Sequence, residues 1–475
     1  MDNPISKKIL SPVLICLQLF IFFVMILLFY IFNLSLETLE AILFFVFFQC
    51  ALISFYDKFF NFYQIFLFFI FLFNIAIPVF SFFDIYSFPP GNRIMLSDGI
   101  EQIVSDESLI LTYQVLISMT LGSSVGWLTG IYFFGHKKLT EFFPLSPLSN
   151  IHFPMKLIFI LLLISMTFRG IYLLFSVKSF GYVNVMHLGG GDSVIFQFFK
   201  MIDLLFKVTS CVILYQCRSK IEYIKYSSLV MIPFVLQAAT GARGESIFVF
   251  IVLIFIYSKF FNNLKIKVVF PSFLLLFIIA VMVGSTRFGG SLTDSFSDIS
   301  FLELIINKIT STSGSIGVIA YTIEIKDDFF NSIPFLFGYA EGVFSFVKNY
   351  SYAGIQDKNY LAQHLIFILE PEKLYRGSTI GTAMGAEFYE FSEGSMTIIF
   401  ILTAIMIFLA TYLINKMYKN VILFYIGFLY LENLFMAPRG SIMKIFNKES
   451  VLSILILIFI VGLVKLMSRP KKINY

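Results

Sequence analysis

Long apolar runs recur along almost the whole chain, and they constrain its fold more than any other feature. The sequence is 58% hydrophobic and 13% charged, whereas about a quarter of the residues in a soluble domain are charged. A run of about 17 to 25 apolar residues is long enough to cross a bilayer as a helix. The runs therefore predict an all-α fold and a polytopic membrane protein.

The positions of the runs predict about twelve membrane-spanning helices. About nine lie in residues 1–285 and three in residues 395–475, and the polar stretch 286–394 separates the two sets as one large loop. Apolar residues at helical spacing over 296–309, and an apolar stretch over 333–346, predict short helices within this loop. The predicted spans are 10–32, 39–56, 63–83, 108–134, 155–175, 194–216, 224–240, 244–261, 266–285, 395–414, 420–437 and 449–467.

The distribution of charge predicts the orientation of the chain in the membrane. Lysine and arginine gather in alternate breaks between spans and near both ends of the chain, as they do on the cytoplasmic side of membrane proteins. We therefore expect both termini in the cytoplasm and treat the net charge of +5 as a topology signal, not as a sign of nucleic-acid binding. The stretch 286–394 contains 7 basic and 13 acidic residues, which predicts that it lies outside.

Two arginines, each followed by a glycine, lie in breaks on the predicted outer side. These are Arg243 and Arg439. The glycine leaves room for a ligand, and a guanidinium group binds an anion through two parallel hydrogen bonds. The alternative is that each arginine anchors a helix end among lipid headgroups. Lys444 and Lys448 make the second break basic against the usual bias, which favours an anion-binding role.

Three further arginines are candidate ligand contacts. Arg287 follows the predicted ninth span, and Arg376 begins a glycine-rich segment before the tenth. Arg169 lies within the fifth span, and a charge there usually marks a cavity or an ion pair. Asp203 and Glu432 are its possible partners, so a structural ion pair is the alternative reading.

The segment 376–394 carries the candidate catalytic groups. Glu387, Tyr389 and Glu390 could project into one outer pocket where the chain turns helical, and a carboxylate in a partly dry pocket can take a proton from a hydroxyl group. His364, the only histidine of the large loop, is a second candidate base. An ordinary helix start and a surface histidine are the alternatives.

No metal and no cofactor are predicted. The four cysteines lie in or beside predicted spans, and the sequence has no Cys/His spacing typical of zinc sites. The early outer breaks also lack a DxD-like pair of aspartates that could bind a metal.

The chain resembles the Wzy family, the polymerases of O-antigen and related repeat-unit polysaccharides. The resemblance rests on the many spans, the large late outer loop, the Arg-Gly pairs at 243 and 439, and the segment Gly381 to Gly394 with Glu387 and Tyr389. It implies a GT-C-like helical bundle in the bacterial inner membrane. It also implies a metal-independent glycosyltransferase that moves a glycan from undecaprenyl pyrophosphate to the terminal sugar of a new lipid-linked unit in the periplasm.

The resemblance also implies roles and partners. Membrane lipid, a flippase and a chain-length regulator would be partners besides the substrate. An O-antigen ligase, a lipid-linked oligosaccharide flippase and a secondary transporter stay open as alternatives. The implied roles are catalysis for Glu387, His364 and Glu390, pyrophosphate binding for Arg243, Arg439, Arg287 and Arg376, and substrate binding for Tyr389 and Arg169.

Overall fold

The computed structural model of the chain is mostly helical. Helix occupies each predicted span except 266–285, which lies almost entirely outside the described residues. The structure describes residues 4–55, 60–86, 92–97, 100–134, 152–180, 194–240, 244–261, 264–265, 269, 271, 303, 306, 309–310, 314–329, 334–338, 360–371 and 381–467.

The long helices follow the order of the predicted spans. The third span is interrupted, because a short π-helix, η1, joins α3 to α4. The elements are α1 (Pro4–Ile31), α2 (Leu36–Ser54), α3 (Phe62–Ile70), η1 (Phe71–Ile75), α4 (Ala76–Phe82), α5 (Asp106–Phe134), α6 (His152–Phe180), α8 (Val194–Gln216), α9 (Lys220–Ala239), α10 (Gly244–Phe260), α18 (Met396–Lys416), α19 (Val421–Met436) and α20 (Lys448–Met467).

Seven segments among the described residues are long and apolar enough to cross a membrane. The helices α8, α9, α10 and α20 also lie at predicted spans but are not among these seven. The chain is therefore a multi-pass membrane protein, and the number of twelve spans stays a prediction. The seven segments are Leu10–Ile31, Leu36–Ser54, Phe62–Phe82, Asp106–Phe134, Met155–Val177, Met396–Lys416 and Val421–Arg439.

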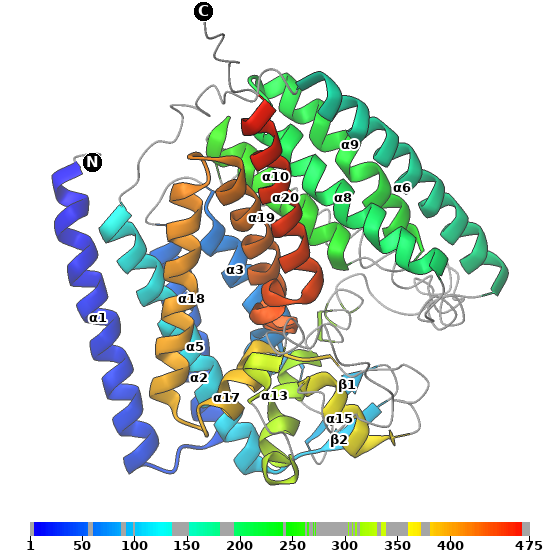
Figure 1. Ribbon diagram of the computed structural model, residues 1–475. Helices are drawn as coiled ribbons and strands as arrows, with labels where there is room; N and C mark the ends of the chain where they lie inside the picture. Colours follow the sequence, from blue (N-terminus) through cyan, green and yellow to red (C-terminus); the bar gives the residue numbers. More distant parts are fainter. Residues whose placement is uncertain are drawn as a thin grey trace, which may run out of the picture.

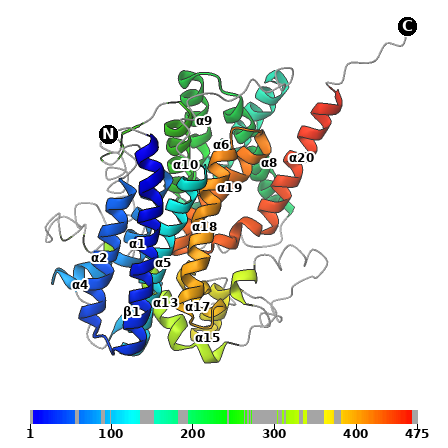
Figure 2. The same ribbon diagram turned by 90° about the vertical axis from the view of Figure 1, so that its left-hand side faces the viewer.

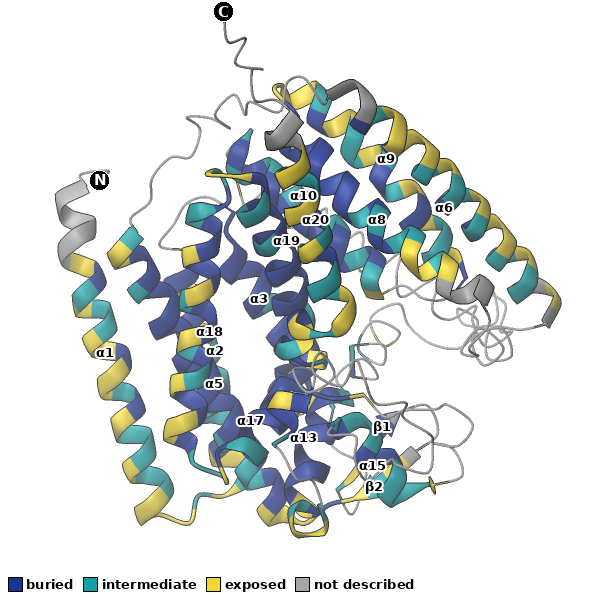
Figure 3. Cartoon of the chain, in the orientation of Figure 1, coloured by how far each residue is buried: buried dark blue, intermediate teal, exposed yellow. Residues whose placement is uncertain are grey.

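The helix α5 lies at the centre of the bundle and α1 at its edge. Buried residues make up 83% of the most apolar stretch of α5 and 11% of that of α1, as the colours of Figure 3 show. The helix α18 packs along α5 at very short range, because Gly122 and Gly126 face its backbone. A Cβ atom on Gly126 would lie 2.2 Å from the carbonyl oxygen of Ala404.

The stretch predicted as a large loop contributes several short helices. They are α13 (Gly314–Glu324), η4 (Lys326–Asp328), η5 (Phe335–Phe337), α15 (Leu361–Leu369) and α17 (Met384–Phe391). Figures 1 and 2 show α13, α15 and α17 together at one end of the bundle, opposite the start of α1 and the end of α20. Glu324 ties this layer to α5, since its carboxylate accepts hydrogen bonds from the Ser105 amide at 3.0 Å and hydroxyl at 2.7 Å.

A β-hairpin in the same layer departs from the all-α prediction. The strands β1 (Arg93–Ser97) and β2 (Ile100–Ile103) pair antiparallel, with Arg93 opposite Ile103. Ile94 and Leu96 are buried, and side chains two residues apart share one face of a strand. The prediction missed this alternation because the segment is short and polar beside the apolar runs that flank it.

Candidate functional site

A buried carboxylate lies where the layer of short helices meets the bundle. Glu387, in the first turn of α17, is 1% exposed. The helix α17 packs against α13 at Gly385, where a Cβ atom would lie 2.8 Å from Ile319 Cδ1. The two helices approach closely here, and the carboxyl of Glu387 bonds the segment that follows α19.

Two hydroxyl groups hold the carboxyl of Glu387. Thr382 donates a hydrogen bond to Oε1 at 3.1 Å, and Ser441 donates one to Oε2 at 2.6 Å. Ser441 precedes the 3-10 helix η9 (Ile442–Phe446), and its Oγ also accepts the Met443 amide at 3.2 Å. The hydroxyl of Ser441 therefore has one fixed direction, with its proton aimed at the carboxylate.

Burial decides the protonation of this carboxyl. It raises the pKa of Glu387 to about 8, an effect larger than the opposing hydrogen bonds from Ser441 and Thr382. The negative charge of Glu390 raises the pKa further. A pKa close to neutral is what a general acid or base needs, because the group can then both accept and release a proton.

Asn74 holds the neighbouring part of the same segment. It is fully buried in η1, and its Nδ2 donates to the carbonyl oxygen of Pro438 at 3.2 Å. Pro78 explains the irregular helix here, since proline has no amide hydrogen to bond the carbonyl four residues earlier, which is that of Asn74. Among the described residues, Asn74 Oδ1 is buried without a hydrogen-bond partner.

Arg439 lies between these two contacts, in the 3-10 helix η8 (Ala437–Arg439). Its side chain is exposed, and the guanidinium carbon lies 5.7 Å from the centre of the Phe73 ring. The structure therefore brings together the two motifs that the sequence singled out separately, the segment before α18 and the break after α19. On one side of Gly440 lies the cationic Arg439, and on the other lies Ser441, which donates to the buried Glu387 carboxyl.

The other candidates of α17 make different contacts. Glu390 accepts a hydrogen bond from the Phe335 amide at 3.1 Å, which joins α17 to η5. Tyr389 is 7% exposed, with the Lys326 ammonium 5.6 Å from its ring centre. Residues 387 and 390 are three apart and lie on the same side of the helix, but their carboxyl groups bond different segments, Ser441 and Phe335 respectively. A common pocket for the three side chains stays a prediction.

His364 lies in another helix of the same layer and packs against Phe335. It lies in α15 and is 1% exposed, so the alternative of a surface histidine is wrong. Its ring packs edge-on against Phe335, with 4.8 Å between ring centres. Glu390 and His364 therefore contact the same residue, Phe335.

Arg169 lies in another part of the molecule, on α6. Its guanidinium donates to the carbonyl oxygen of Phe199 at 3.5 Å and lies 5.6 Å from the centre of that ring. Asp203, one of its two proposed partners, pairs instead with Lys207 at 3.8 Å. The candidates Arg243, Arg287 and Arg376 lie outside the described residues.

The described residues contain no group of three or more His, Cys, Asp or Glu side chains that could hold a metal ion. Independence from metal stays a prediction.

Sequence reasoning missed Thr382, Ser441 and Asn74. Serine and threonine next to a glycine read as ordinary turn residues. The one available signal was the pair Asn74 and Pro78 inside an apolar run, where a polar amide and a helix breaker are both costly. Their role depends on contacts between segments as far apart in sequence as Asn74 and Pro438.

These observations describe a multi-pass membrane protein with a buried, titratable carboxyl at one end of its bundle. Residues 14–471 match the family model of O-antigen polysaccharide polymerase Wzy, and the chain belongs to this family. It is thus an O-antigen polymerase, a membrane glycosyltransferase of lipopolysaccharide biosynthesis that acts on lipid-linked oligosaccharide. No curated protein and no solved structure matches it. The family resemblance seen in the sequence is confirmed, and the alternatives of ligase, flippase and transporter are not favoured.

Proposed function

We propose that the chain transfers a glycan from undecaprenyl pyrophosphate to the terminal sugar of a lipid-linked repeat unit, with Glu387 as general base. The observation that carries this proposal is the buried Glu387 carboxyl, which accepts a hydrogen bond from Ser441. Arg439 lies two residues before Ser441 in the chain. Acceptance of a proton and stabilisation of a leaving anion are the two demands of such a transfer.

The chemical step divides between these two groups. The acceptor hydroxyl forms a bond to the anomeric carbon of the donor sugar and loses its proton to the Glu387 carboxylate. The bond from that carbon to the phosphate oxygen breaks, and the lipid pyrophosphate leaves with the electron pair. Such a transfer passes through an oxocarbenium-like state.

Arg439 meets the charge of the leaving group in this proposal. A pyrophosphate presents forked oxygens that a planar guanidinium binds with two parallel hydrogen bonds. The exposed side chain of Arg439 beside Phe73 can reach a headgroup that stays in the membrane surface. Arg243, Arg287 and Arg376 are further candidates for this role, and Tyr389 and Arg169 for contacts with sugars.

We place this site on the periplasmic side of the bacterial inner membrane, with both termini in the cytoplasm. The basic breaks between spans support this orientation, and the acidity of the stretch 286–394 agrees with it. A flippase that delivers the lipid-linked unit and a regulator of chain length are proposed partners. No metal or cofactor is part of the mechanism we propose.

Replacement of Glu387 by glutamine tests the proposal. Glu387→Gln keeps the shape and a hydrogen-bonding oxygen but cannot take up the acceptor proton. Because general base catalysis contributes about 10² to 10⁴ in rate, we expect core carrying one repeat unit in place of long chains. The measurement is the lipopolysaccharide ladder of a strain that carries the variant as its only copy, with membrane protein level measured in parallel.

Glu393→Gln is the matched control. Glu393 lies two residues beyond the end of α17, and its side chain is exposed. The control should therefore make normal long chains. Long chains of normal length and amount in the Glu387→Gln strain would remove Glu387 from the chemistry. A ladder restored by Glu387→Asp would instead support a base at this position.

A further inference from the structure

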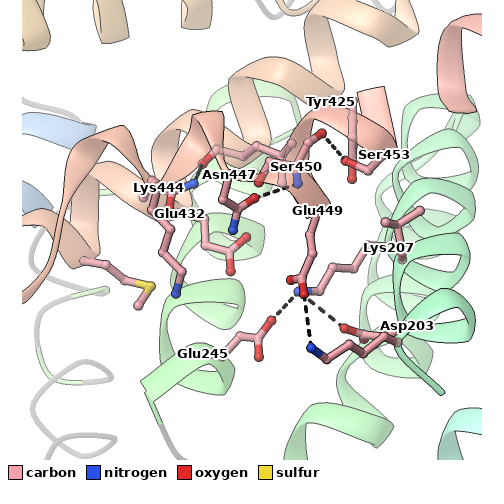
Figure 4. A pocket seen from close by; sticks show the side chains of 15 residues that line it. Asp203, Lys207, Glu245, Tyr425, Glu432, Lys444, Asn447, Glu449, Ser450 and Ser453 are labelled. Carbon is pink, nitrogen blue, oxygen red and sulfur yellow. Dashed lines mark hydrogen bonds and ion pairs between the residues drawn. The ribbon is translucent and has the colours of Figure 1, made fainter. Parts of the chain in front are cut away.

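A separate cavity of about 220 Å³ lies between α8, α10, α19 and the start of α20 (Figure 4). Glu387 does not line it. The segment between α19 and α20 connects the two places, because Ser441 contacts Glu387 and Lys444 lines the cavity. The cavity is smaller than the about 300 to 1,000 Å³ of sites for drug-sized ligands, and its size suits a single sugar ring.

The cavity wall carries three lysines and four acids. Ion pairs join most of them. Lys207 pairs with Glu245 and with Asp203, and Lys200 pairs with Glu449 at 3.8 Å. Gln237 adds a hydrogen bond to Glu245 at 3.4 Å. These contacts fix the charged side chains of α8 and α10 and explain why the helices carry them within an apolar bundle.

Glu432 and Lys444 remain outside these pairs. Glu432, on α19, is 8% exposed, and among the described residues no hydrogen bond or ion pair reaches its carboxyl group. Lys444 lies in η9 with an exposed side chain. Figure 4 shows both side chains converging on the same part of the cavity as Glu245. A buried carboxyl that accepts no hydrogen bond is costly, and inside a membrane bundle it indicates a site of function.

The polarity of the wall selects the class of ligand. A pyrophosphate offers only acceptors and negative charge, and it would meet four acids against three lysines. A sugar hydroxyl both donates and accepts, so it matches a wall in which Glu432 accepts and Lys444 donates. Asn447 adds a further donor, because its Oδ1 accepts the Ser450 amide at 2.7 Å and its Nδ2 makes no hydrogen bond within the part of the chain that the structure describes.

We propose that this cavity binds one sugar residue of the lipid-linked repeat unit, with the Glu432 carboxylate and the Lys444 ammonium hydrogen-bonded to its hydroxyls. The inference rests on the function proposed above and adds a place for the saccharide apart from the reacting bond. In this proposal the segment 438–447 contributes three side chains. Ser441 bonds the base Glu387, Arg439 binds the leaving pyrophosphate, and Lys444 binds the sugar.

A binding measurement with the oligosaccharide of core plus one repeat unit tests this site. The probe is released from the lipopolysaccharide of a polymerase-null strain, which carries core plus one repeat, and is titrated into the purified full chain while saturation transfer to its sugar protons is followed by NMR. Hydrogen bonds to charged groups are strong, so Glu432→Gln and Lys444→Ala should each weaken binding at least about tenfold. Inorganic pyrophosphate should not compete.

Lys448→Ala is the control, since Lys448 follows Lys444 closely but does not line the cavity, and it should bind like the wild type. Wild-type affinity in both cavity variants, or competition by pyrophosphate, would overturn the inference and leave the proposed base untouched. Glu387→Gln should bind the oligosaccharide normally while failing to polymerise. Should Glu432→Gln lower the protein level, Lys444→Ala decides, because its exposed side chain can be removed without a cavity in the core.

Discussion

At the scale of single residues, Glu387 depends on its two hydroxyl partners. Burial sets its pKa near 8, and the hydrogen bonds from Ser441 and Thr382 lower that pKa. The group is therefore protonated in most molecules at neutral pH and gains its basic form as the pH rises. Substitution of Ser441 or Thr382 should therefore shift the pKa of Glu387 while the carboxyl itself is kept.

We expect polymerisation by the purified enzyme to rise with pH through an apparent pKa near 8. In Ser441→Ala the lost hydrogen bond no longer favours the charged form, so the midpoint should move to higher pH while the plateau rate changes less. The measurement is the initial rate of polymerisation of lipid-linked repeat units between about pH 6 and 9.5. A midpoint that moved to lower pH would contradict the assigned role of Ser441.

Arg439 allows a test of charge against geometry. We expect Arg439→Lys to lose about 10² to 10³ in rate, equivalent to about 2 to 4 kcal/mol, because an ammonium group cannot make the two parallel bonds of a guanidinium. An arginine that only anchors the helix end among headgroups would be replaceable by lysine.

The ladder of the variant strain measures the effect of Arg439→Lys. Arg218→Lys is the matched control, since Arg218 is an exposed arginine between α8 and α9. A ladder of wild-type length in the Arg439→Lys strain would return Arg439 to the role of an interfacial anchor.

At the scale of elements, the contact between α5 and α18 positions the site. The helix α18 follows α17 directly, so the depth at which α18 packs on α5 fixes where Glu387 lies. Gly122, Gly126 and Gly130 recur every four residues along α5, and a Cβ atom on each would lie within 2.7 Å of an atom of α18. Small residues at this spacing let two helix backbones approach closely.

Gly126→Ala should destabilise the bundle by about 1 to 3 kcal/mol, because the new methyl group meets the backbone of Ala404 and forces the helices apart. The measurement is the thermal unfolding midpoint of the purified protein in detergent. Gly462→Ala in α20 is the control, since a Cβ atom there has nothing within 4 Å. Equal midpoints for both variants would show that the α5–α18 contact can relax.

At the scale of the whole molecule, the site lies at one end of the bundle. The helix α18 begins beside α17 and runs for 21 residues, or about 30 Å at 1.5 Å per residue, which is the thickness of the hydrocarbon layer. Lys419 therefore lies at the end of the bundle away from Glu387. If Lys419 lies on the cytoplasmic side of the membrane, Glu387 must therefore lie on the periplasmic side.

Reporter fusions test that orientation. Fusions after Arg218 and Lys419 should report the cytoplasm, because basic breaks stay inside, and fusions near Asp98 and Gln356 should report the periplasm. A cytoplasmic signal at Gln356 would overturn the orientation and place the proposed chemistry on the wrong side for a periplasmic polymerase.

The sequence by itself determined the class of the molecule. Apolar length predicts a helix that can span a bilayer without reference to the rest of the chain, so α1, α5, α6 and α18 follow their predicted spans closely. Helical periodicity also predicted a short helix over 296–309, most of which lies outside the described residues, whereas α13 and α15 lie outside the stretches that the periodicity indicated. The hairpin β1–β2 was missed, because its alternation covers too few residues to stand out beside the apolar runs.

Tertiary structure decided the candidate site. Glu387 was singled out from its sequence context, but its partner Ser441 is 54 residues away, and local pattern carries no information on such a contact. The same chain context made Tyr389 and Glu390 look equivalent to Glu387, although it is the Glu387 carboxyl that accepts the hydrogen bond from Ser441. Burial sets the pKa of a carboxyl, and burial is a property of the packed bundle, which periodicity does not specify.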